Sequence, residues 1–267
     1  IGVQTDMATP ALARFGSDEL KREFLAPAIT GDMVACIGVS EPGAGSDVAG
    51  LKTTARTDGD DFIINGTKMW ITNATQADWV CLLANTSDGQ VHANKSLIVV
   101  PLNTPGITIS KPLNKLGMRA SDTGQIFFDD VRVPKRFLIG DENKGFTMQM
   151  MQFQEERMYA AASALKGMER IISDTIEWAK DRHTFGQPVI NNQTVHFKLA
   201  ELQSEIEALR ALTWQACQDH IEGKDATYLA SIAKLKSGRL WRQVTDGCLQ
   251  YWGGMGFMWD NPVARAY

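Results

Sequence analysis

The sequence has few of the residues that build disulfide frameworks and metal centres. It contains only four cysteines and four histidines in 267 residues. No Cys-x-x-Cys pair occurs, and the cysteines stand in apolar surroundings, so we expect buried thiols in a reducing compartment at Cys36, Cys81, Cys217 and Cys248. Neither His-Glu-x-x-His nor Cys/His ligand spacing is present among His92, His183, His196 and His220. No metal is therefore predicted.

Excess positive charge and long apolar runs are also missing. Lys and Arg number 27 against 31 Asp and Glu, for a net charge of -4, which leaves no basic excess for a phosphate backbone. We therefore exclude nucleic acid as a partner. The longest apolar runs, such as LIVV at 97–100, are far shorter than the ~18 residues of a membrane span. The chain begins with neither an initiator Met nor a charged leader, so we expect a trimmed or partial chain.

What is present divides into helical, β-rich and helical parts. The first helical segment begins at Ser17, and we expect Pro27 to limit it. Short β-rich pieces separated by Gly, Asp, Asn and Pro follow at 33–40, 61–72, 79–86, 96–102, 107–110 and 125–134. No long helical pattern interrupts them, which favours an antiparallel sheet or barrel. Helical periodicity then returns at about 146–180, 192–222 and 226–251.

We therefore predict an α+β multidomain protein. Its parts are the end of an N-terminal helical domain (1–32), a β domain (33–139) and a C-terminal helical bundle (140–267) that we expect to be incomplete.

Two stretches of the predicted β domain have the composition of a ligand site. GVSEPGAGSD at 38–47 contains Gly43 and Gly45, whose bare backbone suits phosphate or a flat heterocycle; the alternative is a tight glycine-rich turn. KMWITN at 68–73 places Trp70 and Thr72 on one face of a strand and Ile71 on the other. An indole beside a hydroxyl can border a planar ligand, although core packing is the commoner use of such a pair.

Two stretches of the helical bundle have similar features. AKDRHTFGQPV at 179–189 places Arg182 at the end of a helix that Gly186 and Pro188 terminate. Arg182 either compensates the helix dipole or binds a pyrophosphate. LQYWGGMGF at 249–257 closes a helix on two adjacent glycines, more than a simple cap needs, and this is a second possible close approach of backbone to ligand.

Together with NNQTVHFKLAEL at 191–202, these stretches resemble, in order and spacing, the acyl-CoA dehydrogenase family of flavoproteins. The resemblance extends over essentially the whole chain. It implies FAD between the β domain and the bundle, and a homotetramer or dimer in which one subunit contacts its neighbour's cofactor. Family members have more chain at both ends.

The resemblance also implies roles for particular residues. The flavin ring would lie against the segment from Ile37 to Ser46 and against Trp70, Ile71 and Thr72, and within that segment we expect direct contacts from Ile37, Gly38, Val39, Ser40, Gly45 and Ser46. The residues that resemble those holding the adenine and pyrophosphate half across the subunit interface are Arg182, Thr184, Phe185, Gln193, Gln250, Gly253 and Gly254. Ser46, Asn94 and Arg157 resemble contacts for the CoA portion.

A pair of glutamates offers two candidates for the catalytic base. Successive helical residues are turned by about 100°, so Glu155 and Glu156 cannot both point into one site. We expect the core stripe of this helix to consist of Met151, Met158, Ala162, Leu165 and Ile172, with Glu155 flanking it. Glu156 begins a row of small residues, Ala160, Ser163 and Gly167, which is either a close helix contact or room for an acyl chain.

The resemblance decides between the two glutamates. Most family members keep their catalytic carboxylate near the C-terminus, whereas the long-chain and isovaleryl types carry it on this helix, just before an Arg. Glu156-Arg157 is similar to that arrangement, so we expect Glu156 to be the base and Glu155 to be a solvent-side charge.

The implied reaction is α,β-dehydrogenation of an acyl-CoA thioester to a trans-2-enoyl-CoA, with electrons passed to electron-transfer flavoprotein. The alternatives are an acyl-CoA oxidase, in which oxygen takes the electrons, and a catalytically silent acyl-CoA-binding homologue. The resemblance also implies a compartment, which is the mitochondrial matrix in a eukaryote and the cytoplasm in a bacterium.

Overall fold

The computed structural model describes residues 1–267, which form two compact units, 1–153 and 154–267. The helix α4 (Gly145–Asp181) runs through the division between them. None of the helices combines the length and apolar character that crossing a membrane requires.

Short helical segments open the first unit: α1 (Pro10–Phe15), α2 (Asp18–Leu20) and α3 (Ala26–Thr30), with π-helical turns at Gln4–Ala8 and Lys21–Leu25. The Ser17 hydroxyl accepts a hydrogen bond from Leu20 N at 3.2 Å and caps α2 as expected. The prediction that Pro27 limits this helical run is wrong. Pro27 lies in the first turn of α3, where its missing N–H costs little, and the run ends at Gly31 with φ of 89°.

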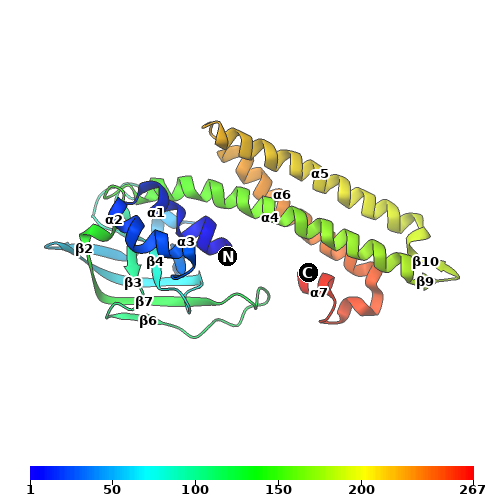
Figure 1. Cartoon of the computed structure of the whole chain (residues 1–267), viewed down its shortest axis with the longest axis horizontal. Helices are drawn as coiled ribbons and strands as arrows, with labels where there is room; N and C mark the ends of the chain where they lie inside the picture. Colours follow the sequence, from blue (N-terminus) through cyan, green and yellow to red (C-terminus); the bar gives the residue numbers. More distant parts are fainter. The chain divides into compact units, whose positions relative to one another are not determined.

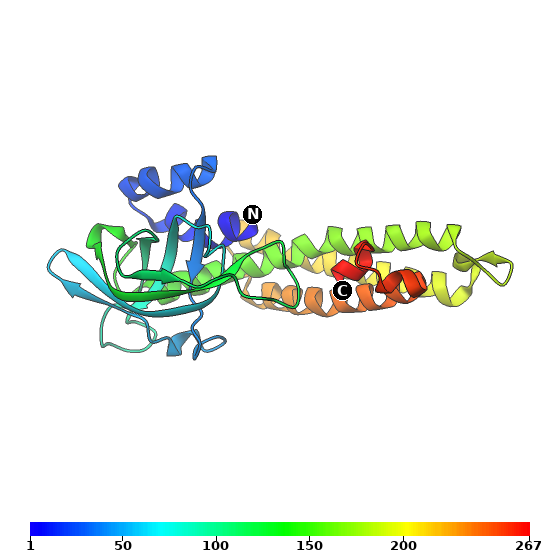
Figure 2. The same cartoon turned by 90° about the horizontal axis from the view of Figure 1, so that it is seen from below.

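The first unit is built on an eight-stranded sheet with the path β6-β7-β3-β2-β4-β5-β8, and β1 pairs with β4 off that path. The strands are β1 (Ala35–Gly38), β2 (Thr54–Asp58), β3 (Asp61–Thr72), β4 (Trp79–Asn85), β5 (Lys95–Pro101), β6 (Ile107–Ile109), β7 (Thr123–Pro134) and β8 (Leu138–Ile139). The long strands β3 and β7 pair antiparallel and form one side of the unit, as Figures 1 and 2 show.

The sheet differs from the prediction in three respects, one of which is the two-residue strand β8, which was not predicted. β1 pairs parallel with β4, in the register Ala35 with Trp79, so the sheet is mixed rather than purely antiparallel. β2 was not predicted, because its sequence TARTD is polar and mostly exposed. Strands β4 and β5 are buried along nearly their whole length and form the centre of this unit's core. The first turn of α4 packs on β5, since a Cβ at Gly145 would lie 2.5 Å from the Ser96 carbonyl carbon.

The second unit is a helical bundle formed by α4 from residue 154, α5 (Gln193–Ile221), α6 (Thr227–Trp252) and the short α7 (Pro262–Ala266). Figures 1 and 2 both show the three long helices side by side. Their observed bounds lie within a residue or two of the predicted ones. A short hairpin, β9 (His183–Thr184) with β10 (Gln187–Pro188), joins α4 to α5.

The predicted core stripe of α4 is partly wrong. Met151 is 48% exposed and Ala162 is also exposed, whereas Ala161 and Met168 are fully buried. The buried positions on the bundle side are Met158, Ala161, Leu165, Met168, Ile171, Ile172, Thr175 and Ala179. Residues up to 153 pack in one unit and the later ones in the other, so no single stripe extends along the whole helix.

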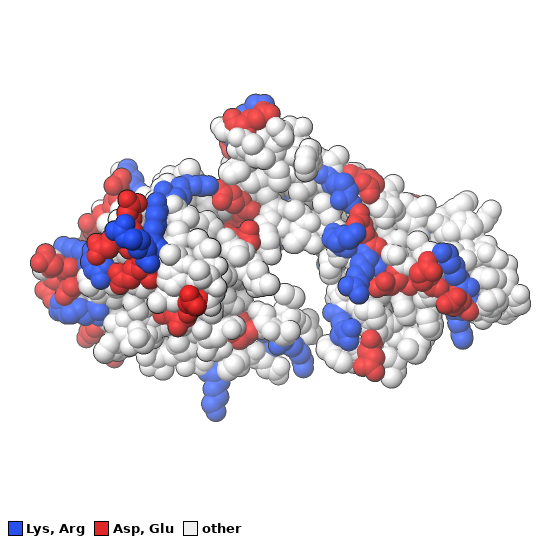
Figure 3. Space-filling model, viewed as in Figure 1, with Lys and Arg blue, Asp and Glu red and all other residues white.

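The distribution of charges and the burial of the cysteines agree with the expectations from the sequence, except at Cys217. On the face drawn in Figure 3, basic and acidic side chains are interspersed and neither sign dominates. Cys36, Cys81 and Cys248 are buried, and burial raises the pKa of Cys248 to about 11. Cys217 is only partly buried, so the expectation of a buried thiol is wrong at that position.

Candidate functional site

The glycine-rich segment that follows β1 contains two glycines, Gly43 and Gly45, that its local fold does not require. Gly43 and Gly45 have ordinary negative φ angles, and a Cβ at either position would meet nothing within 4 Å. Glu41 and Ala44 exchange backbone hydrogen bonds of 2.9 and 3.1 Å, which close the turn between them. Neither turn geometry nor packing therefore requires these two glycines, and they leave open space beside backbone amides.

The other residues predicted at this segment vary in burial. Ile37 is partly buried at the end of β1, and Val39 is buried. Gly38 is required by packing, since a Cβ there would come within 2.9 Å of Val80 Cγ2. Ser40 is partly exposed and Ser46 is exposed.

Trp70 stands at a bulge in β3 that turns its side chain outward. The register between β3 and β7 shifts between Lys68 and Ile71, and Trp70 has a φ of 59°, a conformation that L residues rarely adopt. The Trp70 side chain is 56% exposed, whereas the neighbouring Ile71 is 3% exposed. An exposed indole on a strained backbone is typical of a ligand surface. Thr72, partly buried, makes no side-chain hydrogen bond within the chain.

Two segments are joined directly in this region, because Met69 N donates to Ser40 O at 2.8 Å. The glycine-rich segment and the Trp70 bulge therefore lie next to each other in the first unit.

Asn94 lies in the turn before β5. Its Oδ1 accepts a hydrogen bond from Lys95 Nζ at 2.9 Å, and its carbonyl accepts one from Thr86 N at 2.9 Å. The side chain is thus held in place and partly exposed.

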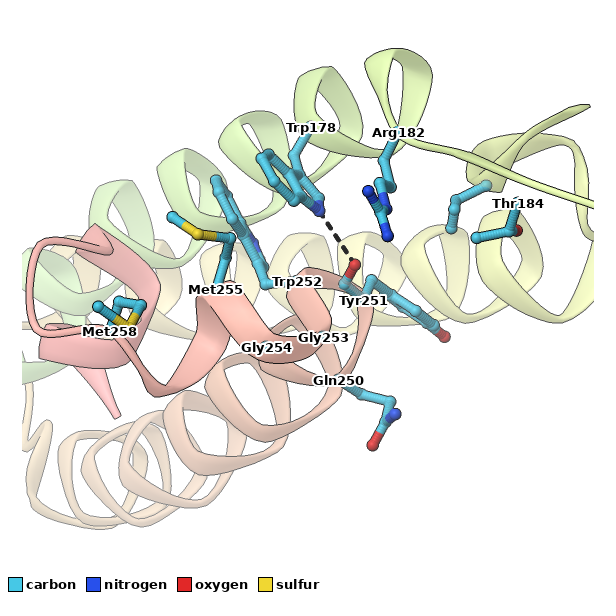
Figure 4. Close-up of a pocket in the computed structure, with 11 residues that line it drawn as sticks. Trp178, Arg182, Thr184, Gln250, Tyr251, Trp252, Gly253, Gly254, Met255 and Met258 are labelled. Carbon is cyan, nitrogen blue, oxygen red and sulfur yellow. Dashed lines mark hydrogen bonds between the residues drawn. The ribbon is translucent and has the colours of Figure 1, made fainter.

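A cavity of about 750 Å³ in the second unit brings together five of the predicted residues. Arg182, Thr184, Gln250, Gly253 and Gly254 all line it. Arg182 directly follows α4, and its guanidinium extends toward the loop after α6 (Figure 4). It has no carboxylate or carbonyl partner in the chain, so its donors are available to an anionic ligand.

The two adjacent glycines of this loop, Gly253 and Gly254, differ in whether the local structure requires a glycine. Gly253 has φ of 56° and ψ of -133°, which only glycine adopts readily, so it is needed to end α6. Gly254 has no such requirement, and a Cβ on it would meet nothing within 4 Å. Its bare backbone again faces open space.

The same cavity contains an aromatic wall that sequence reasoning missed. Trp178 and Trp252 stack with ring centroids 4.7 Å apart and planes 14° apart, as Figure 4 shows. Trp178 Nε1 donates to Tyr251 O at 3.1 Å, and Trp252 Nε1 donates to Thr175 Oγ1 at 3.0 Å. The spacing of four residues from Trp178 to Arg182, one helical turn, is the signal that could have indicated it.

Phe185 and Gln193 are not among the residues lining this cavity. Phe185 lies at the tip of the β9–β10 hairpin, fully exposed, where its φ of 51° and the 81° of Gly186 match a two-residue hairpin turn. Gly186 and Pro188 therefore belong to this hairpin and do not terminate α4, which ends at Asp181. Gln193 is exposed at the first position of α5.

The two glutamates of α4 differ in their surroundings within the second unit. Glu155 Oε1 lies 3.4 Å from His220 Nε2 of α5, and its side chain is 23% exposed. Glu155 is therefore a partly buried residue that faces a neighbouring helix rather than an open solvent-side charge. Glu156 and Arg157 are partly buried as well and point from successive positions of the same turn.

Comparison with known proteins follows the same division of the chain. Residues 36–131 match the middle domain of acyl-CoA dehydrogenases, and residues 143–267 match their C-terminal domain. The long-chain specific acyl-CoA dehydrogenase of Sus scrofa is 38% identical over 99% of this chain and 62% of its own length. The short-chain specific enzyme of Bos taurus is 36% identical over 100% of this chain and 65% of its own length. The chain thus spans about two thirds of these mitochondrial relatives.

Solved structures agree with these matches. The crystal structure of an acyl-CoA dehydrogenase from Geobacillus kaustophilus is 38% identical and superposes with a TM-score of 0.97, covering 100% of this chain and 71% of that one. A structure of PigA with FAD and proline is 27% identical, with a TM-score of 0.96 over 99% of this chain and 69% of that one. The short helices, central sheet domain and helical domain are those expected from the sequence. The chain belongs to the acyl-CoA dehydrogenase family.

Proposed function

We propose that this protein binds FAD and oxidises an acyl-CoA thioester to the trans-2-enoyl-CoA. The observation that carries the proposal is the set of glycines at 43, 45 and 254, which neither backbone geometry nor packing requires. They occur beside an outward-turned indole in one unit and an unpaired guanidinium in the other. These features suit a ligand with a flat ring at one end and a diphosphate group at the other. Exposed backbone N–H groups and the guanidinium can bind the diphosphate, and the indole offers a planar surface to the ring.

The residues of each unit would hold a different part of the cofactor. In the first unit, the segment from Ile37 to Ser46 with Trp70, Ile71 and Thr72 would hold the flavin ring, where the Thr72 hydroxyl can donate. In the second unit, Arg182 would bind the diphosphate, and the stacked pair of Trp178 and Trp252 adds an apolar wall to the same cavity. FAD, when bound, would supply the acceptor for the hydride from the substrate's β-carbon.

We propose Glu156 as the base that removes the α-proton. A carboxylate with an ordinary pKa of about 4.3 is too weak a base for a thioester α-C–H, so the site must exclude water and thereby raise its pKa. Excluding water also strengthens each hydrogen bond to the thioester oxygen, where negative charge develops. The partly buried position of Glu156 and the engagement of Glu155 with His220 support this choice. With Glu156 as the base on α4, just before Arg157, we propose that the protein is of the long-chain or isovaleryl type.

The CoA portion would contact Ser46, Asn94 and Arg157. Asn94 is held by its bond from Lys95 Nζ, which fixes the amide for recognition of a polar group. Arg157 can pair with a phosphate of CoA as a charge-assisted donor.

Further partners follow from the same proposal. Electron-transfer flavoprotein would take the electrons, and three further copies of the chain would complete a homotetramer. Large apolar side chains that are exposed in the second unit support contacts with other copies: Phe185, Phe197, Trp214, Tyr228, Phe257 and Trp259. The compartment would be the mitochondrial matrix for a eukaryotic source and the cytoplasm for a bacterial one.

Anaerobic titration of the FAD-loaded protein tests the proposal and the acyl chain together. Butyryl-, isovaleryl-, octanoyl- and palmitoyl-CoA are each added while the flavin absorbance near its oxidised maximum is followed. We expect bleaching by at least one of them, with enoyl-CoA formed in equal amount. Peroxide produced in air at the rate of turnover would indicate an oxidase instead. A protein that binds no FAD, or whose flavin no thioester reduces, would contradict the proposal.

A further inference from the structure

One fully buried lysine lies directly beneath the proposed flavin surface. Lys68 precedes the Trp70 bulge by two residues on β3, and its side chain is 0% exposed. Its Nζ donates to Val39 O at 3.0 Å and to Glu41 Oε1 at 2.9 Å. Both acceptors belong to the glycine-rich segment. A single side chain thus ties β3 to the segment that faces the proposed ligand.

The carboxylate of Glu41 extends this connection. Glu41 is 6% exposed, and its Oε1 also accepts a hydrogen bond from Thr53 N at 2.9 Å. Its Oε2 accepts one from Lys52 N at 2.7 Å. Three separate segments therefore meet at the Glu41 carboxylate. The bond from Met69 N to Ser40 O adds a backbone link between the residues next to Lys68 and Glu41.

Stability alone does not account for an ion pair at this depth. The free energy needed to remove two charges from water is about as large as the free energy of their attraction. A protein with apolar residues of the same size in place of the pair is often as stable or more stable. What a charged pair with directional hydrogen bonds does provide is one defined geometry. The part of the chain whose geometry it defines is the segment 39–41, which includes Ser40 and ends two residues before Gly43.

The structure assigns to Lys68 a positioning role: through Val39 O and Glu41 it holds the glycine-rich segment against β3, so that this segment and Trp70 present one fixed surface to the flavin. This inference rests on the proposed function. A released segment would sample several arrangements, and apparent flavin affinity falls in proportion to the fraction that remains competent. If about a tenth of molecules kept the bound arrangement, the Kd for FAD would rise about tenfold.

The experiment compares Lys68→Met, Glu41→Gln and the double variant Lys68→Met/Glu41→Gln with the unaltered protein. The Kd for FAD is measured by flavin fluorescence, the flavin midpoint potential by spectroelectrochemistry and the melting temperature separately. We expect Lys68→Met to melt earlier, because it leaves the Glu41 carboxylate buried without its cation. We also expect about tenfold weaker FAD binding and a more negative midpoint potential, since fewer fixed N–H dipoles face the reduced flavin.

The double variant separates positioning from stability. Neutralising both partners should return much of the melting temperature, whereas FAD binding should stay about tenfold weaker, with a changed potential. Recovery of the unaltered Kd and potential in the double variant would overturn the inference, as would an unchanged Kd in Lys68→Met. If Lys68→Met does not fold, Glu41→Gln and the double variant give the same comparison.

Lys95→Met is the matched control. Lys95 is also fully buried in the same sheet, but its Nζ donates to Val91 O and to Asn94 Oδ1, a proposed CoA contact outside the proposed flavin surface, so this variant is compared by FAD binding and not by acyl-CoA turnover. Its Kd for FAD should be unaltered, and an equal loss there would mean that any buried charge removed from this sheet has the same effect. Failure of the unaltered protein to bind FAD would contradict the proposed function itself, whereas unchanged variants would contradict only the role of Lys68.

Discussion

Gly167 of α4 lies directly against the indole of Trp241 on α6. A Cβ at Gly167 would stand 2.7 Å from Trp241 Cζ3 and 2.8 Å from its Cη2. The row of small residues that begins at Glu156 is therefore a close helix contact at its Gly167 end. Ser163, one turn earlier, is exposed, so the room that we propose for an acyl chain would lie in the part of the row nearer Glu156.

Gly167→Ala should destabilise the bundle even though alanine is the better helix former. Overpacking costs about 1–3 kcal/mol, against roughly 1 kcal/mol gained in helix propensity. Gly238→Ala on α6 is the matched control, because a Cβ there would meet nothing within 4 Å. It should stabilise the protein by up to about 1 kcal/mol. Urea unfolding of both variants measures the difference, and equal shifts would contradict the contact.

The proposed base can be tested against its neighbour in sequence. Glu156→Gln should retain FAD and lose flavin reduction by acyl-CoA by about 10²- to 10⁴-fold, because the amide cannot take the α-proton. Glu155→Gln keeps the same size and also loses one charge, so it is the control. It should reduce flavin at nearly the unaltered rate, since Glu155 faces His220. Stopped-flow absorbance measures both.

Two outcomes would refute the assignment of Glu156. One is an equal loss of flavin reduction in both variants, which would indicate a general effect on α4. The other is a Glu156→Gln variant that remains active, which would place the base elsewhere.

Local patterns were sufficient to predict the long elements of the fold. The bounds of β3 were predicted as residues 61–72, which is what the structure has, and the three long helices differ by a residue or two. Alternation and helical periodicity are local properties of the sequence. The parallel pairing of β1 with β4 is not, because strand partners are set by the tertiary fold.

The residues of the candidate site could be predicted where they belong to a sequence motif, but not where their role depends on burial or backbone conformation in the folded chain. The cavity residues Arg182, Gln250 and Gly254 followed from their motifs, whereas the positive φ of Trp70 arises from a bulge that no propensity indicates. Lys68 did leave a signal. It has the same strand phase as the inward-facing Phe62 and Ile64, so a buried lysine that needs a partner could have been inferred.

Arg182→Ala should weaken FAD binding by about 10- to 100-fold, the equivalent of one charged hydrogen-bonding group worth about 1.5–3 kcal/mol. Arg170→Ala, on the same helix, is the control, because Arg170 is exposed and faces Asp174 at 3.7 Å instead of the cavity. Equilibrium dialysis of FAD gives both affinities, and size-exclusion chromatography reports any loss of oligomers. A flavin-loaded tetramer of unaltered affinity in Arg182→Ala would count against its role.

The pair Lys68 and Glu41 should make stability depend on pH in two separate ranges. Burial lowers the pKa of Lys68 to about 8, although the charge of Glu41 opposes this shift. Burial alone would raise the pKa of Glu41, but the charge of Lys68 and the hydrogen bonds outweigh it and lower that pKa below 4.5.

The sign follows from which state holds the proton more tightly. Between pH 8 and 10.5 the unfolded chain binds the Lys68 proton better than the folded chain does, so the free energy of unfolding rises with pH from this group. The rise is roughly 3 kcal/mol at most. The Lys68→Met variant lacks this group and should not show the rise. From pH 8 to 10.5 the free energy of unfolding of the unaltered protein should therefore increase relative to that of the variant. Glu41 acts at the acid end, where its contribution is present above pH 4.5 and is lost as pH falls through its lowered pKa. Urea midpoints at pH 7.5, 9 and 10.5 measure the first effect, and a constant difference would mean that Lys68 has the same pKa in the folded and the unfolded chain.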